Sequence, residues 1–243
     1  MHLIKSGSKY YTVKSGTKNY LWDGDYLIEN GQLKWCNPNI YLDLTDFASG
    51  TGLKINTGII PTQNTTYEVV ARTVAVSGTA NDHCPFVILN PLNNYEFGVW
   101  AYPNSNFRVA YDTGWKNTSV KCNLNEKFKV ASRINNNKYI INVNGTDYEY
   151  NITDKQTDMP LFLGCWNHGY SNGNPPIPYY YYNGKIYLFK LYESGILSMY
   201  LVPVPLGMQI GNFTVPSNGM FDIVTQSFFT GSGSGTFTYG KDE

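Results

Sequence analysis

The sequence predicts an all-β protein in which two antiparallel sheets stack face to face as a sandwich. Three observations lead to this fold class. Short runs rich in β-branched and aromatic residues recur at sandwich spacing from Leu53 onward. Asn144-Gly145 joins two alternating runs, and Asn-Gly is the strongest short-range signal of a β-hairpin. No ten-residue stretch repeats its apolar residues with the helical period, so we expect little helix.

Within the first fifty residues, a short sequence pattern occurs twice. Residues 4–10 and 13–19 each read as strand, Ser-Gly turn and strand, and units this short cannot bury a face by themselves. We therefore expect residues 1–50 to form a hairpin-like arm. Two roles stay open for it, an attachment segment or plain strands on the main sheet. The sandwich is expected over residues 51–243.

The strands of the sandwich follow from alternation and turn residues. The aromatic run at residues 179–192 contains Asn183-Gly184, which opens one of them. Pro203, Pro205 and Pro216 interrupt the last third, where the one place for a short helical turn is residues 220–226. The expected strands are residues 66–75, 86–89, 95–102, 107–112, 128–134, 139–143, 148–152, 161–165, 185–192, 196–202, 209–215 and 236–239.

Charge and composition exclude several classes of partner. Eighteen basic residues balance eighteen acidic ones, and no Lys/Arg run occurs, so neither nucleic acid nor an anionic membrane surface is an expected partner. No stretch approaches the length of an apolar membrane span, and the first residues lack the apolar core of a signal peptide. Aromatic residues make up 16% of the chain and charged residues only 15%. A neutral, aromatic surface of this kind suits sugars and protein contacts.

The four cysteines, Cys36, Cys84, Cys122 and Cys165, have no metal-binding or redox spacing. We expect buried free thiols. One or two disulfides stay open, since sequence does not determine connectivity.

Six motifs occur in a fixed order along the chain. They are residues 52–58 followed by 61–64, 141–145, 161–164, 183–192, 201–203, and 221–224 with 235–237. As a set they resemble the concanavalin A-like, laminin-G-like domains of phage and prophage structural proteins, over about residues 50–240. The resemblance implies a jelly-roll sandwich. In that family a strand near the start lies beside the last strand, and the Gly184-Lys-Ile-Tyr strand lies inside one sheet.

The resemblance also implies a function. It identifies a virion protein of a tail, fibre or capsid appendage, made in the host cytoplasm, that forms homo-oligomers and contacts other virion proteins. Its lectin-like domain is expected to bind glycans on the host surface or on mucus. A purely structural subunit is the alternative. The family sometimes uses Ca²⁺, so this ion stays open, although no oxygen-rich segment has the spacing of a defined loop. No other cofactor or metal is expected.

Catalysis is not expected. Glycosidases need two carboxyls at set separations. The candidate pair at strand spacing is Asp147 and Glu149, which we interpret as the solvated face of a hairpin. No nucleophile motif accompanies the three histidines. A glycan-degrading enzyme is the weaker alternative.

The candidate glycan site combines aromatic rings with directional polar groups. Residues 165–178 are expected to be a loop, because they are rich in Gly and Pro. Its candidate residues are Trp166, Asn167, His168, Tyr170 and Asn172. The alternative role for Trp166 is to cap the core. A second cluster, around the hairpin near residues 100–112, is either part of the same groove or an oligomer contact; it contains Trp100 and Trp115 with Tyr102, Asn104, Asn106 and Asp112.

Overall fold

The structure is a computed structural model. It describes residues 2–6, 10–15, 18–44, 54–74, 84–90, 95–112, 114–154, 156–168, 177–179, 181–232 and 236–243, and every structural statement below concerns these residues. Throughout them each regular element is a β-strand. No helix of the described chain is long and apolar enough to span a membrane.

One layer of the fold is a six-stranded sheet with the strand order β12-β11-β10-β9-β17-β18. Strands β17 and β9 run parallel, and the other neighbours in this sheet are antiparallel. The strands are β9 (Phe86–Asn90), β10 (Tyr95–Trp100), β11 (Asn106–Asp112), β12 (Gly114–Lys121), β17 (Trp166–His168) and β18 (Ile177–Tyr179).

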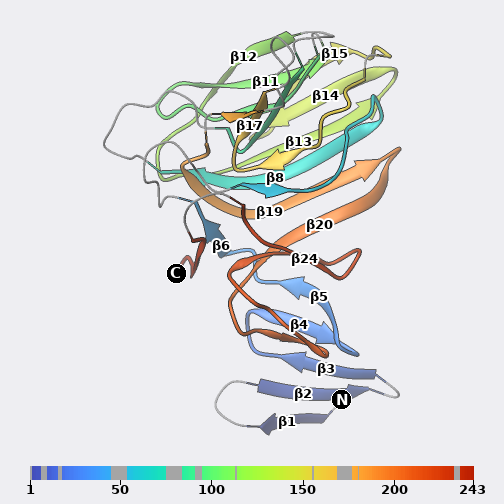
Figure 1. The fold of residues 1–243 in the computed structure, drawn as a ribbon, viewed down its shortest axis with the longest axis vertical. Coiled ribbons are helices and arrows are strands. Elements are labelled where there is room, and N and C mark those ends of the chain that lie inside the picture. Colours follow the sequence, from blue (N-terminus) through green and yellow to red (C-terminus); the bar gives the residue numbers. More distant parts are fainter. Residues whose placement is uncertain are drawn as a thin grey trace.

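The other layer is a ten-stranded sheet with the order β15-β14-β13-β8-β19-β20-β23-β24, in which β6 pairs with both β19 and β25. Figure 1 shows the two layers stacked at one end of the molecule. The strands are β6 (Ile40–Asp43), β8 (Thr65–Thr73), β13 (Lys127–Asn135), β14 (Lys138–Val143), β15 (Thr146–Asn151), β19 (Gly184–Glu193), β20 (Ile196–Val204), β23 (Gly219–Asp222), β24 (Ser227–Phe229) and β25 (Thr238–Lys241).

The core between the layers is aromatic. Phe86 and Phe97 from the six-stranded sheet meet Tyr67 and Tyr139 from the ten-stranded sheet, and all four side chains are fully buried. Tyr67 contacts both phenylalanines edge-on, at centroid distances of 4.7 and 5.4 Å. Alternation along each strand places these rings on the inner faces. The expected sandwich is therefore confirmed, as an all-β jelly-roll.

Two details expected from the resemblance are also present. The early strand β6 lies beside the last strand, β25, with Tyr239 opposite Leu42. Strand β19 lies inside the large sheet, between β8 on one edge and β20 and β6 on the other. The chain thus returns at its end to the strand with which the sandwich begins.

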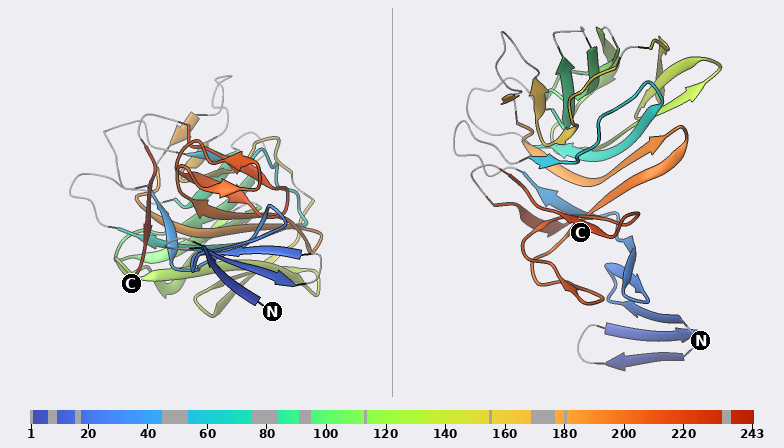
Figure 2. Two further views of the ribbon diagram at one scale, coloured as in Figure 1. Left: turned by 90° about the horizontal axis from the view of Figure 1, so that it is seen from below. Right: turned by 45° about the vertical axis from the view of Figure 1, so that its right-hand side comes forward.

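The first strands form a separate antiparallel meander that extends away from the sandwich (Figures 1 and 2). Its strands β4 and β5 pack through Ile28 and Leu33 on a second apolar core that includes Val204 and Phe221. Strand β6, although within the first fifty residues, belongs to the large sheet. The meander comprises β1 (His2–Ser6), β2 (Tyr10–Ser15), β3 (Lys18–Trp22), β4 (Tyr26–Glu29) and β5 (Gln32–Cys36). Two short ribbons complete the fold, β7 (Ile55–Asn56) with β16 (Phe162–Leu163), and β21 (Gln209–Ile210) with β22 (Phe213–Thr214).

The predicted Asn-Gly hairpin is confirmed, whereas the prediction of a short helical turn at residues 220–226 is wrong. Asn144 and Gly145 have φ values of 47° and 96°, as a tight turn between β14 and β15 requires. Residues 220–226 instead belong to the hairpin of β23 and β24. Asp222 stabilises its turn, because one carboxylate oxygen accepts from the Val224 amide at 3.0 Å and the other accepts from the Thr225 hydroxyl at 2.6 Å.

The four cysteines are confirmed as buried free thiols. Burial raises the pKa of the Cys122 thiol to about 11 and that of the Cys165 thiol to about 12. Protonated, enclosed thiols of this kind act as small apolar side chains.

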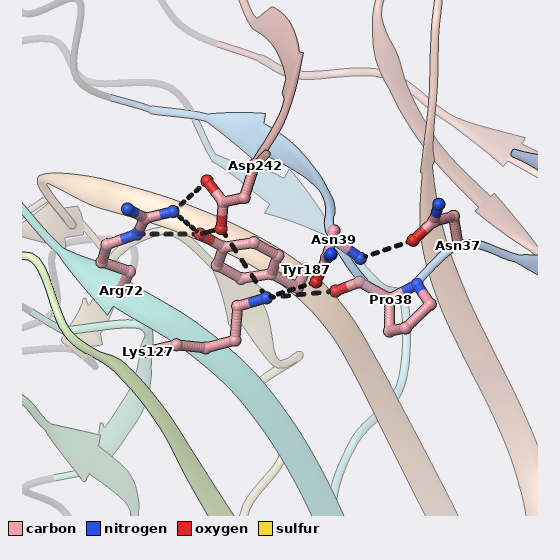
Figure 3. Close-up of polar contacts among 7 residues, drawn as sticks. All are labelled: Asn37, Pro38, Asn39, Arg72, Lys127, Tyr187 and Asp242. Atoms are coloured by element: carbon pink, nitrogen blue, oxygen red, sulfur yellow. Dashed lines mark hydrogen bonds and ion pairs between the residues drawn. The ribbon is translucent and has the colours of Figure 1, made fainter.

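A clamp of charged and aromatic groups holds the end of the chain on the large sheet (Figure 3). The Tyr187 hydroxyl donates to Asp242 at 2.7 Å. Arg72 pairs with the same carboxylate and donates through Nε to the Tyr187 hydroxyl at 2.8 Å. Lys127 lies 3.8 Å from the centroid of the Tyr187 ring and donates to the Pro38 carbonyl at 3.3 Å. The clamp joins strands β8, β13 and β19 to the segment that follows β25.

We expect this clamp to make the free energy of unfolding depend on pH. Burial alone would raise the pKa of the Asp242 carboxyl, but hydrogen bonds from Tyr187 and Arg72 and the nearby positive charges hold that pKa below its usual range. A carboxyl whose pKa is lower in the folded state stabilises the fold fully at a pH above its unfolded-state pKa of about 4. This stabilisation is lost as the pH falls through the folded-state pKa. Asp242→Asn should therefore cost about 1–2 kcal/mol at neutral pH and progressively less in acid.

Urea unfolding of the wild type and the Asp242→Asn variant between neutral and acidic pH measures this difference. The exposed Asp154, changed to Asn, is the control. A difference between wild type and Asp242→Asn that stays constant across the whole pH range would contradict the assignment.

Candidate functional site

A hollow of about 410 Å³ opens where the hairpin of β11 and β12 meets the ends of β14 and β15. The backbone reverses sharply here, since Tyr111 of β11 pairs with Gly114 of β12. The hollow is lined by Tyr111, Asp112, Gly114, Trp115, Lys116, Lys138, Glu149, Tyr150, Asn151 and Thr153. Its size is that of a site for a small ligand.

Trp115 presents an exposed aromatic surface at this hollow. Its side chain is 47% exposed, which is unusual for a large apolar ring on a sheet edge. The residue follows the β11–β12 turn and pairs with Ala110. An exposed indole beside a hollow is a flat platform for the apolar face of a ligand.

Asp112 supplies a buried acceptor in the same hollow. Its side chain is only 5% exposed, and its Oδ1 atom has no hydrogen-bond partner in the described structure. The residue has a left-handed φ of 64°, which non-glycine residues adopt rarely and often at functional sites. Leaving a buried carboxylate oxygen unpaired costs free energy. Because Asp112 lines the hollow, a ligand there that donated a hydrogen bond to this oxygen would relieve that cost.

A second unpaired acceptor lies nearby. The Thr153 side chain also lines the hollow, and its buried Oγ1 atom makes no hydrogen bond with any residue the structure describes. A hydroxyl both donates and accepts. Asp112 and Thr153 together thus offer the directional polar groups that a hydroxylated ligand needs.

Two tyrosines support the hollow from the core. Tyr111 stacks on Tyr139 with ring centroids 3.7 Å apart, and Tyr150 donates to the Val109 carbonyl at 2.6 Å. Burial raises the pKa of Tyr111 to about 12 and raises that of Tyr150 as well. Both phenols are therefore neutral at physiological pH, and both rings are held in place.

The rim carries balanced charge. Lys116 donates to the Glu149 carbonyl and lies 4.2 Å from the Tyr150 ring centroid, and Lys138 donates to Asn151. Each lysine is already engaged by the protein. Among the residues that the structure describes, the buried atoms of this lining without a hydrogen-bond partner are Asp112 Oδ1 and Thr153 Oγ1.

Arg108 lies next to the hollow on the outer face of the six-stranded sheet. Its guanidinium carbon is 4.4 Å from the Trp115 ring centroid and 5.1 Å from that of Tyr102. Its Nε donates to Asn117 at 3.1 Å. Trp115 therefore contacts both the hollow and this stacked cation.

The second predicted cluster is brought together only in part. Trp100 pairs with Arg108 in register, and Trp115 occupies the same outer face. Trp100 is only 5% exposed and packs with Cys84, Val87 and Ala110, so its ring is part of a small outer core. Asn104 and Asn106 lie at the opposite end of β11 from Asp112.

The structure does not bring together the residues of the first predicted cluster, the loop at residues 165–178. The loop expected over residues 165–178 is wrong in two places, since residues 166–168 form β17 and residues 177–179 form β18. Pairing with β9 overrides the local Gly and Pro content. His168 is opposite Leu89 in the sheet that carries Trp115. Asn167 faces inward, fully buried, and donates to the Pro160 carbonyl at 2.7 Å.

Three other candidate residues of that cluster are described only in part or lie outside the described residues. Trp166 is placed by its backbone opposite Val87. Tyr170 and Asn172 lie outside the described residues.

Sequence reasoning missed Arg108, Thr153 and Tyr150. Arg108 had a readable signal, since it alternates with the core residues Phe107 and Val109 and so had to point outward. Thr153 and Tyr150 had none, because Tyr150 reaches the hollow from β15 of the other sheet and Thr153 from the segment that follows β15.

Within the described ranges, the acidic residues outside the hollow are paired or stand apart from one another. Asp147 accepts from Arg133 at 3.1 Å and from Asn142 at 2.7 Å, on the exposed hairpin of β14 and β15. These hydrogen bonds lower the pKa of Asp147. Glu96 lies opposite Asp112 in register, and burial raises the pKa of its carboxyl. Among the described residues no three His, Cys, Asp or Glu side chains gather as a metal site.

Comparisons with known proteins give a likeness in fold at low sequence identity. No protein-family model and no curated protein matches the sequence. The fold is similar to the crystal structure of a native heptameric SAP-like pentraxin from Limulus polyphemus, with a TM-score of 0.49 and 8% sequence identity over 85% of this chain and 97% of that chain. The jelly-roll assignment rests on the strand order and register of this chain.

Proposed function

We propose that this protein is a carbohydrate-binding module and that its site is the hollow between Trp115 and Asp112. The observation that carries the proposal is a buried carboxylate oxygen, without a hydrogen-bond partner in the described chain, beside a 47% exposed indole. Sugars present apolar C–H faces surrounded by hydroxyl groups. The indole matches such a face, and Asp112 and Thr153 match the hydroxyls.

The module acts by binding alone in this proposal. A glycosidase acid needs a raised pKa, whereas Arg133 and Asn142 hold the pKa of Asp147 low. Glu149, on the same face of β15, lines the rim, where its backbone carbonyl accepts from Lys116. A time-dependent loss of glycan chain length, abolished by Asp147→Asn or Glu149→Gln, would instead identify an enzyme.

We further propose that the module belongs to a phage virion, where it adheres to glycans of the host surface or of mucus and works as a homo-oligomer. The motif resemblance at residues 183–192 and 221–224 supports this setting, and so does the meander that extends from the sandwich (Figure 2). The alternative is a structural subunit without glycan binding. Mass measurement in solution and glycan binding by the same sample distinguish the two.

Replacing Trp115 with alanine should weaken glycan binding about 10- to 100-fold, because the stacking surface of the hollow is lost, a change of about 1.4–2.8 kcal/mol. A glycan array that includes bacterial capsule fragments identifies a ligand, and calorimetry on that ligand measures the change. Trp35→Ala is the matched control, since Trp35 is 37% exposed but lies on the meander. Equal affinity of the Trp115→Ala variant and the wild type would overturn this placement of the site.

A further inference from the structure

We propose that Arg108 forms an anion-binding subsite next to the hollow, so that the glycan recognised is an acidic oligosaccharide. This inference rests on the proposed function and specifies its ligand class. The relevant anion is a carboxylate or sulfate substituent on the saccharide. The subsite consists of Arg108 with its supports Tyr102, Trp115 and Asn117.

The first argument is the missing counter-ion. Arg108 is partly buried, yet no carboxylate of the described residues pairs with it, and its one hydrogen bond uses Nε. By contrast, Arg72 and Arg133 each pair with an aspartate. A guanidinium carries five N–H donors. The two terminal nitrogens of Arg108 therefore keep their donors for an external acceptor.

The second argument is preorganisation. The guanidinium lies over two aromatic rings, 4.4 Å from Trp115 and 5.1 Å from Tyr102, and Asn117 fixes its orientation through Nε. Because Asn117 engages only Nε, the edge formed by the two terminal nitrogens of the guanidinium stays free. Such an edge binds a carboxylate through two parallel hydrogen bonds. The side chain has little conformational freedom left to lose on binding.

The third argument is the position relative to the hollow. Arg108 and Asp112 are four residues apart on β11, opposite Trp100 and Glu96 of β10. The rise of a strand places their backbones about 13 Å apart, which exceeds one sugar ring. Trp115 lies between them, opposite Ala110. A ligand whose hydroxyls donate to Asp112 and whose anion accepts from Arg108 must extend across the indole and must have a fixed direction.

A structural role alone is the competing explanation. Arg108 could brace the two rings without touching a ligand. That role predicts loss of thermal stability on substitution and no change in the preference between acidic and neutral ligands. The two explanations are thus separated by ligand selectivity rather than by affinity.

The test uses matched sets of immobilised oligosaccharides: chains with uronic acid carboxylates, the same chains after reduction of the carboxylates to alcohols, and chains with sulfate esters. Wild type, Arg108→Gln, Arg108→Lys and Trp115→Ala are compared. Arg133→Gln is the control, since Arg133 is exposed and paired with Asp147. Thermal unfolding of each variant verifies folding.

We expect the wild type to prefer at least one anionic set over the reduced chains by about tenfold or more, a preference that decreases with salt. Arg108→Gln should bind all sets with the affinity of the reduced chains. Arg108→Lys should keep part of the preference, because the charge remains without the fork. The relative response to carboxylate and sulfate identifies the anion.

Several results would overturn the inference. If the wild type binds acidic and reduced chains equally, or if Arg108→Gln keeps the full preference, the subsite does not exist while the hollow still binds sugar. If Trp115→Ala retains all binding, the proposed function at this hollow fails first. If the wild type binds none of the chains, both the function and the subsite are rejected.

Discussion

Replacing Phe97 with alanine should lower the free energy of unfolding by about 3–5 kcal/mol, the usual cost of deleting a large ring from a packed core. Phe97 is fully buried in β10. Its ring lies 5.4 Å from Tyr67, 6.2 Å from Phe86 and 6.4 Å from Tyr139, measured between centroids. The substitution leaves a cavity at the point where aromatic rings of both sheets meet. Rigid neighbours on all sides prevent the cavity from collapsing.

Chemical denaturation of the wild type and the Phe97→Ala variant measures this loss. Phe213→Ala is the matched control, since Phe213 is 40% exposed in the small ribbon of β21 and β22. The control should lose much less stability. If the two variants are destabilised equally, the centre of the core lies elsewhere.

Replacing Gly98 with alanine should cost about 2–4 kcal/mol, because the added methyl group has no space and the backbone angle disfavours it. Gly98 has a φ of 142°, and a Cβ built on it would lie 2.4 Å from the Phe86 carbonyl oxygen and 2.7 Å from Val87 Cα. These atoms belong to the backbone of β9, the neighbouring strand. They cannot yield without separating β9 from β10.

Gly114→Ala is the control for this prediction. Gly114 stands at the start of β12, its φ lies outside the left-handed region, and a Cβ there meets no atom within 4 Å. Urea unfolding of both variants gives the comparison. A stable Gly98→Ala variant would mean that β9 and β10 can move apart at little cost.

Both substitutions lie in β10, and Glu96 of this strand is directly opposite Asp112. A variant that loosens β10 would therefore displace the buried carboxylate of the hollow and weaken binding indirectly. Trp115 and Arg108 avoid this difficulty, because both side chains lie on the outer face, away from the packed rings. Binding tests are clearest on these two residues.

Local sequence determined most of the strands. Alternation in residues 127–135 and the turn at Asn144-Gly145 needed no knowledge of distant residues, because one face of each strand is buried and the turn requires positive φ. The same local reasoning indicated the four buried thiols. It failed at residues 220–226, where the carboxylate of Asp222 stabilises a turn and hairpin pairing follows.

The candidate site was recognisable only in fragments. Trp115 stood out as an aromatic residue with a neighbouring acid, Asp112. Alternation alone could not show that Asp112 would be buried without a partner, since this depends on the strands packed around it. Residues 165–178 were interpreted as one recognition loop, but pairing with β9 turns Asn167 into the interior.

The sequence by itself thus determined the all-β class, the hairpins and the neutral, aromatic composition, since each of these depends on residues that are close along the chain. Only the tertiary structure decided that β11, β12, β14 and β15 border one hollow and that Arg108 stacks on Trp115. It also decided that Asp112 Oδ1 and Thr153 Oγ1 have no hydrogen-bond partner within the described part of the chain. The physical reason is that a sandwich joins strands from two sheets, and the packing between sheets is a long-range property.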